Sequence, residues 1–208
     1  MNEGLTIVRG MSHGILVEAT DLLLEAFALK LEHDLRPKTP EQARRLIAES
    51  IAPELGWVAL GERGALLGVA GVGVYRRRFS QIRPRTFLHE FGLLGAISRW
   101  LPVFFEEVMT RPGRRQWCLE VLAVTGASRG SGVGSRLLSE VLAAAREAGV
   151  RSVGLEVVDT NVRAMQLYER IGFRRVLSIP TAWLTESSGY RAIHFMRFDV
   201  SEMNEGSV

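Results

Sequence analysis

The stretch that decides the fold reads WCLEVLAVTGASRGSGVGSRLLSEVLAAAREA and covers residues 117–148. Its first eight residues are mostly apolar and predict a buried strand over 117–124. After a short turn, apolar residues recur three and four positions apart from Ser135 onward, which predicts an amphipathic helix. Gly149 is placed to end that helix. The stretch is therefore a strand, a glycine-rich turn and a helix in direct succession.

The glycine-rich turn, residues 129–134, has the composition of an anion-binding site. The first N–H groups of a helix have no backbone partner, and the helix dipole adds partial positive charge there. Glycines let a ligand approach the backbone closely, and a pyrophosphate fits such a site. A tight turn without a ligand is the alternative. A Walker A loop is excluded because no Lys-Ser/Thr pair follows, and the dinucleotide fingerprint is excluded because Ser135 stands where a third glycine is needed.

The order of residues in this turn resembles motif A of the GCN5-related N-acetyltransferase (GNAT) family, Arg/Gln-x-x-Gly-x-Gly/Ala. The chain has Arg129, Gly132 and Gly134 at the fixed positions. A second block, 155–173, resembles motif B of the same family. Its spacing is similar to that of bacterial enzymes that acetylate the N-terminal alanine of a ribosomal protein. The two blocks in this order are more specific than either block alone, and the close resemblance covers 117–176.

The resemblance implies an α/β fold, a mixed and mostly antiparallel sheet with a splayed parallel pair of central strands and flanking helices. The rest of the chain agrees with that order. Before the central stretch the patterns predict a strand at 5–9, helices at 14–32 and 40–52, and a hairpin of 56–61 with 65–75. Thr39 is the expected cap of the second helix. After the central stretch they predict a parallel strand at 151–158, a helix at 161–171 and strands beginning at 173 and 190.

The segment 76–115 is longer than a simple link between two strands needs. We interpret 87–109 as an inserted helical element whose apolar surface packs on its own domain, on an acceptor or on a second subunit. Shaping the acceptor site is slightly preferred, and a homodimer stays an alternative. Five arginines precede the insertion, and a solvated loop is preferred for them over a site for phosphate or an acidic partner: Arg76, Arg77, Arg78, Arg83 and Arg85.

Bulk properties set limits on the class of protein. The 208 residues suit a single domain over 1–200 followed by a disordered tail at 201–208. The first ten residues lack the apolar core of a signal peptide, and no apolar run is long enough to span a membrane, so we expect a cytoplasmic protein. A net charge of +3 is too small to argue for nucleic acid. No metal is expected, because the four histidines show no ligand spacing.

The resemblance implies acetyl-CoA as the cofactor. The helix start would hold the pyrophosphate, and the strand end at Val124 would offer backbone groups to the pantetheine. Asn161 would contact the cofactor in addition to capping its own helix. The cofactor-binding residues expected on this basis are Leu122, Ala123, Val124, Arg129, Gly130, Ser131, Gly132, Val133, Gly134, Ser135, Asn161, Ala164 and Tyr168.

Acetyl transfer to an amine needs a base for the amine and an acid for the leaving thiolate. Tyr168 is the leading acid, because it lies two helical turns after Asn161, where the tyrosine of family members points at the sulfur of coenzyme A. A core tyrosine is the alternative. The base stays open between Glu120, Glu156 and a water chain. A strand glutamate is costly to bury unpaired, so either residue faces a cleft or pairs with an arginine.

These residues predict an acetyl-CoA-dependent N-acetyltransferase that acts by direct attack of a primary amine in a ternary complex. Tyr168 would protonate the thiolate. The acceptor is a small-molecule or peptide amine that the sequence does not identify. The alternative is an acyl-CoA-binding regulatory module that has the fold without catalysis. Nucleic acid is a weaker alternative partner, since no aromatic residues are interleaved with the arginines.

Overall fold

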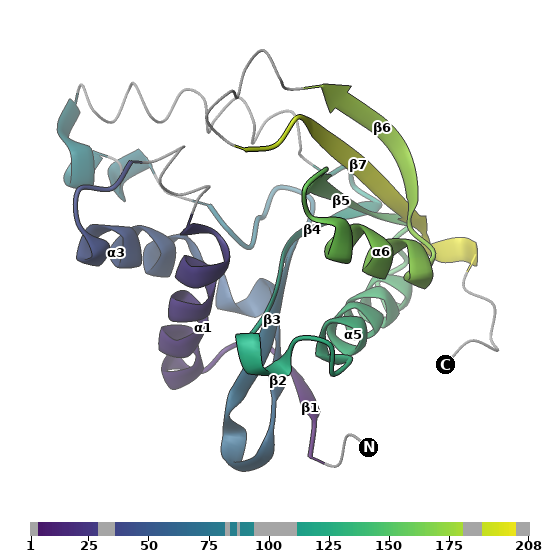
Figure 1. Ribbon diagram of the computed structural model, residues 1–208, viewed down its shortest axis with the longest axis horizontal. Helices are drawn as coiled ribbons and strands as arrows, with labels where there is room; N and C mark the ends of the chain where they lie inside the picture. The colour runs from purple at the N-terminus through teal and green to yellow at the C-terminus, as the bar shows by residue number, and fades with distance from the viewer. Residues whose placement is uncertain are drawn as a thin grey trace.

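The computed structural model describes residues 4–28, 36–81, 84–86, 88–93, 112–180 and 189–202. In this part of the chain seven strands form one sheet with the order β1-β2-β3-β4-β5-β7-β6 (Figure 1). Only β4 and β5 run parallel, and the other neighbouring strands are antiparallel. The predicted fold class, a mostly antiparallel sheet with one parallel pair and flanking helices, is confirmed.

The first half of the chain folds in the predicted order: β1 (Thr6–Arg9), α1 (His13–Ala26), α3 (Pro40–Ser50), η1 (Pro53–Leu55), β2 (Gly56–Leu60), η2 (Glu62–Gly64) and β3 (Leu66–Gly73). The cap of α3 is confirmed, because the Thr39 hydroxyl accepts a 3.2 Å bond from the Gln42 N–H. The Gln42 side chain reaches back to the N–H of Lys38 at 2.7 Å. The helix predicted over 14–32 ends earlier than expected, because α1 stops at Ala26 and Phe27 is its C-cap.

The second half consists of β4 (Gln116–Val124), η3 (Gly126–Ser128), α5 (Val133–Glu147), β5 (Ser152–Val158), α6 (Val162–Ile171), β6 (Arg174–Pro180), β7 (Ala192–Asp199) and η4 (Val200–Glu202). α5 begins two residues earlier than the sequence pattern predicts. Gly149 and Gly172 follow α5 and α6 with φ of 66° and 110°, a left-handed conformation that suits glycine at a helix end. The tail beyond 202 lies outside the described residues.

Helices cover both faces of the sheet (Figure 1). On one face the buried side of α5 packs on Leu119, Val153 and Leu155. On the other face α1 and α3 pack on a second cluster that includes Val121 and Ala123. β4 contributes to both clusters because its pairing with β3 shifts by one residue at Glu120, where Val72 opposes Leu119 and Gly71 opposes Val121. Side chains alternate between the two faces along a strand. The extra residue at the bulge therefore places Val121 and Ala123 on the face opposite to Leu119.

The segment after β3 folds back over the α1–α3 face. Phe79 is fully buried against Gly71, where a Cβ would lie 2.1 Å from its ring. The preferred interpretation of the arginine cluster as a solvated loop is wrong for Arg78, whose side chain is 17% exposed and pairs with Glu120. It holds for Arg77, which pairs with Glu54 at the surface. Arg83 lies outside the described residues.

Part of the predicted insertion docks on α3. Residues 88–93 are helical, and the Glu90 carboxylate accepts bonds of 2.9 and 3.0 Å from the Arg45 guanidinium. The Gln42 side chain donates to the Glu90 backbone oxygen at 2.8 Å, and the Thr86 hydroxyl donates to Glu49 at 2.7 Å. Most of the residues predicted to form the element at 87–109 lie outside the described residues. Its role in shaping the acceptor site stays a prediction.

Candidate active site

The parallel strands β4 and β5 are paired only over their first halves. Their ladder runs from Gln116 opposite Ser152 to Leu119 opposite Leu155, whereas β4 continues to Val124 and β5 to Val158. Beyond this ladder the two strands are not paired with each other, and we call the region between their carboxyl ends the β4–β5 gap. Ligands of α/β proteins commonly bind outside the carboxyl ends of parallel strands, so this gap is the natural place for a site.

The glycine-rich turn presents unpaired donors beside that gap. Gly130 and Gly132 have φ of 84° and 89°, which favours glycine at both positions. The N-cap of α5, Gly132, has no side chain to bond the first turn. The helix is closed at its start by a 3.0 Å bond from the Arg136 N–H to the Gly132 oxygen. The N–H groups of 133–135 precede that bond and point out of the helix start. This arrangement fits an anion such as a pyrophosphate.

Gly134 lies where the turn meets the gap. A Cβ added there would be 3.5 Å from Leu167 of α6 and 3.6 Å from Val124 at the end of β4, which is ordinary contact. Leu122 and Val124 pack partly against the α5-side cluster, whereas the side chain of Ala123 is buried on the opposite face. Among these predicted cofactor residues, Ala123 can therefore contribute only backbone groups.

Arg129 lies at the exposed rim of the turn. Its Nε donates a 3.4 Å bond to the Val124 backbone oxygen, and a terminal nitrogen lies 3.7 Å from the Glu25 carboxylate of α1. Both side chains of this ion pair are more than half exposed, so the pair is weak and easily exchanged for another anion. The role of Arg129 in cofactor binding stays a prediction.

Asn161 caps α6. Its side-chain oxygen accepts a 3.2 Å bond from the N–H of Ala164, so the capping alternative for Asn161 is confirmed. This bond uses the oxygen of the amide, and the amide nitrogen is a separate donor. Tyr168 follows one helical turn after Ala164, on the side of α6 that faces the sheet.

Tyr168 is a buried tyrosine whose hydroxyl makes no hydrogen bond to any residue in the described part of the chain. The side chain is 7% exposed, and its ring lies 5.8 Å from the ring of Phe173 within the α5-side cluster. Burial raises the pKa of Tyr168 to about 12, so the hydroxyl keeps its proton at neutral pH. A buried hydroxyl usually has a partner, because an unpaired one is costly. The ring of Tyr168 is therefore part of the core, as expected for a core tyrosine. Its hydroxyl is available to a ligand.

Glu120 stands in the bulge of β4 with both carboxylate oxygens bonded. One oxygen accepts a 2.6 Å bond from Arg78 and the other a 3.0 Å bond from the N–H of Ser80. Its side chain is 5% exposed and lies over Gly73, where a Cβ would be 2.2 Å from Oε1. Burial raises the pKa of Glu120, although Arg78 acts in the opposite direction. Glu120 therefore pairs with an arginine, which is one of the two arrangements predicted for a buried strand glutamate.

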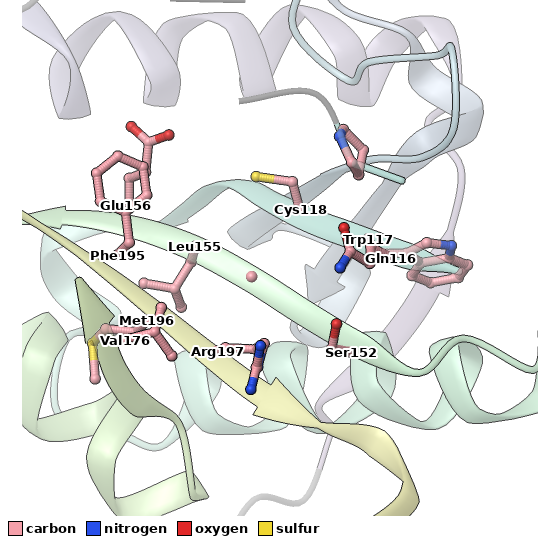
Figure 2. Close-up of a pocket in the computed structure, with 12 residues that line it drawn as sticks. Gln116, Trp117, Cys118, Ser152, Leu155, Glu156, Val176, Phe195, Met196 and Arg197 are labelled. Carbon is pink, nitrogen blue, oxygen red and sulfur yellow. The ribbon is translucent and has the colours of Figure 1, made fainter. Parts of the chain in front are cut away.

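Glu156 lies on the face of β5 opposite to the α5-side residues Leu155 and Val157. It is the first residue of β5 beyond the ladder with β4. Figure 2 shows its carboxylate and the thiol of Cys118 on the same side of the sheet. Both residues line a cavity of about 220 Å³. Burial, followed by the charges of Glu120 and Glu156, raises the pKa of the Cys118 thiol to about 12.

The structure therefore separates the candidate acid and the candidate base. Tyr168 belongs to the α5-side cluster and Glu156 to the opposite face, with the β4–β5 gap next to both. Several residues of the cavity were not predicted from the sequence, among them Gly154 and Arg197. A glycine inside an apolar strand was the available signal, because it often marks a close approach of a ligand.

Two absences hold for the described residues only. They contain no group of three or more histidine, cysteine, aspartate or glutamate side chains arranged to bind a metal ion. None of the helices that the structure describes has the length and apolar character needed to cross a membrane.

Comparisons with known proteins agree with this geometry. A model of the Acetyltransferase (GNAT) family matches residues 18–173, which is most of the chain. A thialysine N-epsilon-acetyltransferase from Bos taurus is 32% identical over 103 residues, which are 50% of this chain and 54% of that protein. The chain thus spans about half the length of this relative.

Two solved structures share the fold. A GCN5-related N-acetyltransferase from Kribbella flavida superposes with a TM-score of 0.61 at 22% identity and covers 96% of this chain and 99% of its own. A ribosomal-protein alanine N-acetyltransferase from Escherichia coli has a TM-score of 0.52 at 16% identity, with 98% and 99% covered. With motif A at the start of α5, motif B in β5–α6 and a family model over 18–173, the chain belongs to the GNAT family of acetyltransferases.

Proposed function

We propose that the protein transfers an acetyl group from acetyl-CoA to a primary amine by direct attack, with Tyr168 as the acid. One observation carries the proposal. The unpaired ends of β4 and β5 leave a gap, and an unbonded buried hydroxyl lies on one face of the sheet and a carboxylate on the other. A thioester seated in that gap would have a proton donor for its sulfur on one side and a group that accepts the amine proton on the other.

The chain's own groups fit acetyl-CoA. When bound, this cofactor supplies an acetyl group activated as a thioester. The N–H groups of 133–135 and the guanidinium of Arg129 would hold its pyrophosphate. The unpaired backbone at the end of β4 would bond the pantetheine arm, and Gly134 leaves room for that arm between Val124 and Leu167.

Glu156 is favoured over Glu120 as the base. Glu120 is held by Arg78 and the Ser80 N–H, and it points under the segment after β3. Proton uptake by Glu120 would weaken these bonds in a buried place. Glu156 lines the cavity next to the gap, where an acceptor can arrive. A water molecule between Glu156 and the amine is compatible with this role.

The transfer balances with these two groups. The amine nitrogen forms a C–N bond to the acetyl carbon, and the C–S bond breaks. The amine proton passes to Glu156, directly or through water, and the Tyr168 hydroxyl gives its proton to the leaving sulfur. Proton exchange with solvent then restores both side chains.

Cys118 supports direct attack over a covalent acetyl-cysteine. It is the single cysteine of the chain, and its thiol has a pKa of about 12 because it is buried beside two glutamates. The thiolate is the nucleophilic form of cysteine, and almost none of it forms at neutral pH under these conditions.

A thiol-release assay over a panel of small-molecule and peptide amines tests the function. The names of the similar proteins suggest which amines to include, an ε-amine of a lysine analogue and an N-terminal alanine. We expect CoA release that depends on the amine and on the Tyr168 hydroxyl. Tight binding of acetyl-CoA without CoA release for any amine would instead support the regulatory module considered above.

A further inference from the structure

Ser152 places a buried hydroxyl in the cavity beside β4 and β5. The residue is the first of β5, is 6% exposed and lines the cavity of about 220 Å³ together with Gln116 and Gly154. Its hydroxyl makes no hydrogen bond to any residue that the structure describes. Buried side-chain oxygens usually have a partner, because an unpaired one is costly. The partner of this hydroxyl must therefore come from the cavity itself.

Gln116 of β4 presents a second hydrogen-bonding group at the same end of the cavity. It lies directly opposite Ser152 in the parallel ladder. Its side-chain oxygen accepts a 3.2 Å bond from the N–H of Gly113, which fixes the amide, because only the oxygen can accept. The amide nitrogen is thus turned toward Ser152 (Figure 2). Within the described part of the chain, this nitrogen has no hydrogen-bond partner. A hydroxyl and an NH2 group therefore face one space.

Charges at this end of the cavity cancel. Asp199 of β7 lies directly opposite Ser152, and its carboxylate is 3.2 Å from the Nε of Arg197. A charged group of a ligand would meet one like and one opposite charge here, and it would lose water without a compensating partner. A neutral oxygen, of a carbonyl or a hydroxyl, instead accepts hydrogen bonds from both Ser152 and Gln116. The two donors thus favour an uncharged oxygen.

Gly154 lies between this end of the cavity and the β4–β5 gap. A Cβ added at Gly154 would have no side chain within 4 Å, only the backbone oxygens of Met196 at 3.8 Å and of Trp117 at 3.9 Å. Gly154 therefore presents no side chain to a ligand that lies along β5. The β4–β5 ladder ends at Leu155, three residues beyond Ser152, which is roughly 10 Å along a strand. Three residues of an extended peptide have roughly the same length.

From this geometry we infer that the acceptor is an elongated molecule, uncharged apart from its amine, that lies along β5. Its amine lies at the β4–β5 gap, and a carbonyl or hydroxyl oxygen at its far end accepts from Ser152 and Gln116. The extended N-terminus of a peptide fits this length, with its third carbonyl at Ser152. The inference rests on the proposed function for the reacting amine, and it is independent of which group takes up the amine proton.

Two pairs of amines test the far end of the acceptor. Octylamine and 8-aminooctan-1-ol differ in the terminal oxygen, and dialanine amide and trialanine amide differ in the third carbonyl. We expect kcat/KM to be about tenfold higher for the longer-reaching or oxygen-bearing member of each pair, because it satisfies a buried hydroxyl. An advantage found only in the alcohol pair would overturn the assignment to a peptide and support a small-molecule acceptor with a hydroxyl.

Two variants remove the recognition in different ways. Ser152→Ala should abolish the advantage of 8-aminooctan-1-ol and of trialanine amide, and it should leave octylamine unaffected. Gln116→Glu keeps the oxygen that bonds Gly113 and replaces the NH2 group by a negative charge. It should therefore shift the preference to 1,8-diaminooctane, whose far end is a cation and which the wild type should use no better than octylamine.

Ser50→Ala is the matched control. Ser50 is also a buried serine, 4% exposed, but its hydroxyl donates a 2.8 Å bond to the backbone oxygen of Ile47. Ser50→Ala should lower the melting temperature and keep the acceptor preference, whereas Ser152→Ala should keep the melting temperature and lose the preference. A lowered melting temperature of Ser152→Ala with an unchanged preference would show a purely structural hydroxyl and overturn the inference.

Calorimetric binding of trialanine amide to the protein with CoA separates the inference from the proposed function. Equal turnover within both pairs of amines would overturn the inference and leave the transferase intact. Binding that Ser152→Ala weakens by about tenfold, with no CoA release for any amine, would support the site and overturn the transferase.

Discussion

The guanidinium of Arg78 lies 2.6 Å from the carboxylate of Glu120, and this pair joins the segment after β3 to the bulge of β4. Two neighbouring hydrogen bonds also hold this segment in place. The N–H of Ser80 bonds the other carboxylate oxygen, and the backbone oxygen of Phe79 accepts a 2.8 Å bond from the N–H of Ala52. A residue that the sequence offered as a base is therefore part of the support of the sheet face where the acceptor is proposed to bind.

Removal of one partner of this pair should destabilise the fold. Arg78→Met leaves the Glu120 carboxylate buried without its cation, which costs about 3 kcal/mol of unfolding free energy by analogy with other buried pairs. The folded pKa of Glu120 is already raised and would rise further, so the deficit should be smaller in acid, where the carboxyl is protonated, and grow as the pH rises. Denaturant unfolding at several pH values measures both effects.

Arg77→Met is the matched control for that measurement. Arg77 pairs with Glu54, and both side chains are more than half exposed, so the loss should stay below about 0.5 kcal/mol. Equal losses for the two variants would contradict the structural role of Arg78. Glu120→Gln combined with Arg78→Met should recover part of the stability, because no buried charge then lacks a partner.

The identity of the base is tested by the pH dependence of kcat/KM. Glu156→Gln should lower kcat/KM by about a hundredfold or more and abolish the acidic limb of the profile. Glu120→Gln should keep that limb, since Glu120 is bound by Arg78 and not by the acceptor. An acidic limb that persists in both variants would mean that water is the base or that the amine arrives neutral.

Tyr168→Phe removes the unbonded hydroxyl and leaves the ring against Phe173. We expect kcat to fall by about ten- to a thousandfold because the proton donor to the sulfur is lost. Acetyl-CoA affinity and thermal stability should hardly change, since the hydroxyl bonds no residue in the described part of the chain. Stopped assays with calorimetry and a melting curve separate these quantities, and a fully active Phe variant would leave Tyr168 with a structural role only.

Gly134→Ala should weaken acetyl-CoA binding by about tenfold while the protein stays folded. The added Cβ makes ordinary contacts with Leu167 and Val124 but narrows the gap that the pantetheine would cross. Gly126→Ala is the control in the same turn, because a Cβ there has no neighbour within 4 Å. Calorimetry on both variants decides the matter, and unchanged affinity in Gly134→Ala would argue against this path for the cofactor.

The docking of 88–93 on α3 should weaken in acid. The hydrogen bonds from Arg45 hold the pKa of Glu90 at about 2, below its ordinary value of 4.5. A carboxyl with a lowered folded pKa stabilises the protein above 4.5 and loses that effect as the pH falls toward 2. Glu90→Gln should be less stable than the wild type at neutral pH, and the difference should vanish in acid. Hydrogen exchange of 88–93 gives the local readout.

The sequence alone determined the local parts of the site. Glycines at 130 and 132 adopt the left-handed conformations that only glycine takes easily, and Thr39 and Asn161 cap the helices that follow them. Such features depend on a few adjacent residues, so a pattern of residues suffices to predict them. The order of strands and helices followed from the same patterns together with the two family motifs.

The tertiary structure decided which side chains meet across strands. A one-residue bulge at Glu120 turns the second half of β4 over, and no local pattern reports such a shift. It brings Glu120 to Arg78, 42 positions away, a pairing that the sequence did not specify. The cavity lined by Glu156 likewise depends on the register that sets Cys118, Gly154 and Arg197 side by side. Register is a property of paired strands, and it forms only when residues distant in the chain have come together.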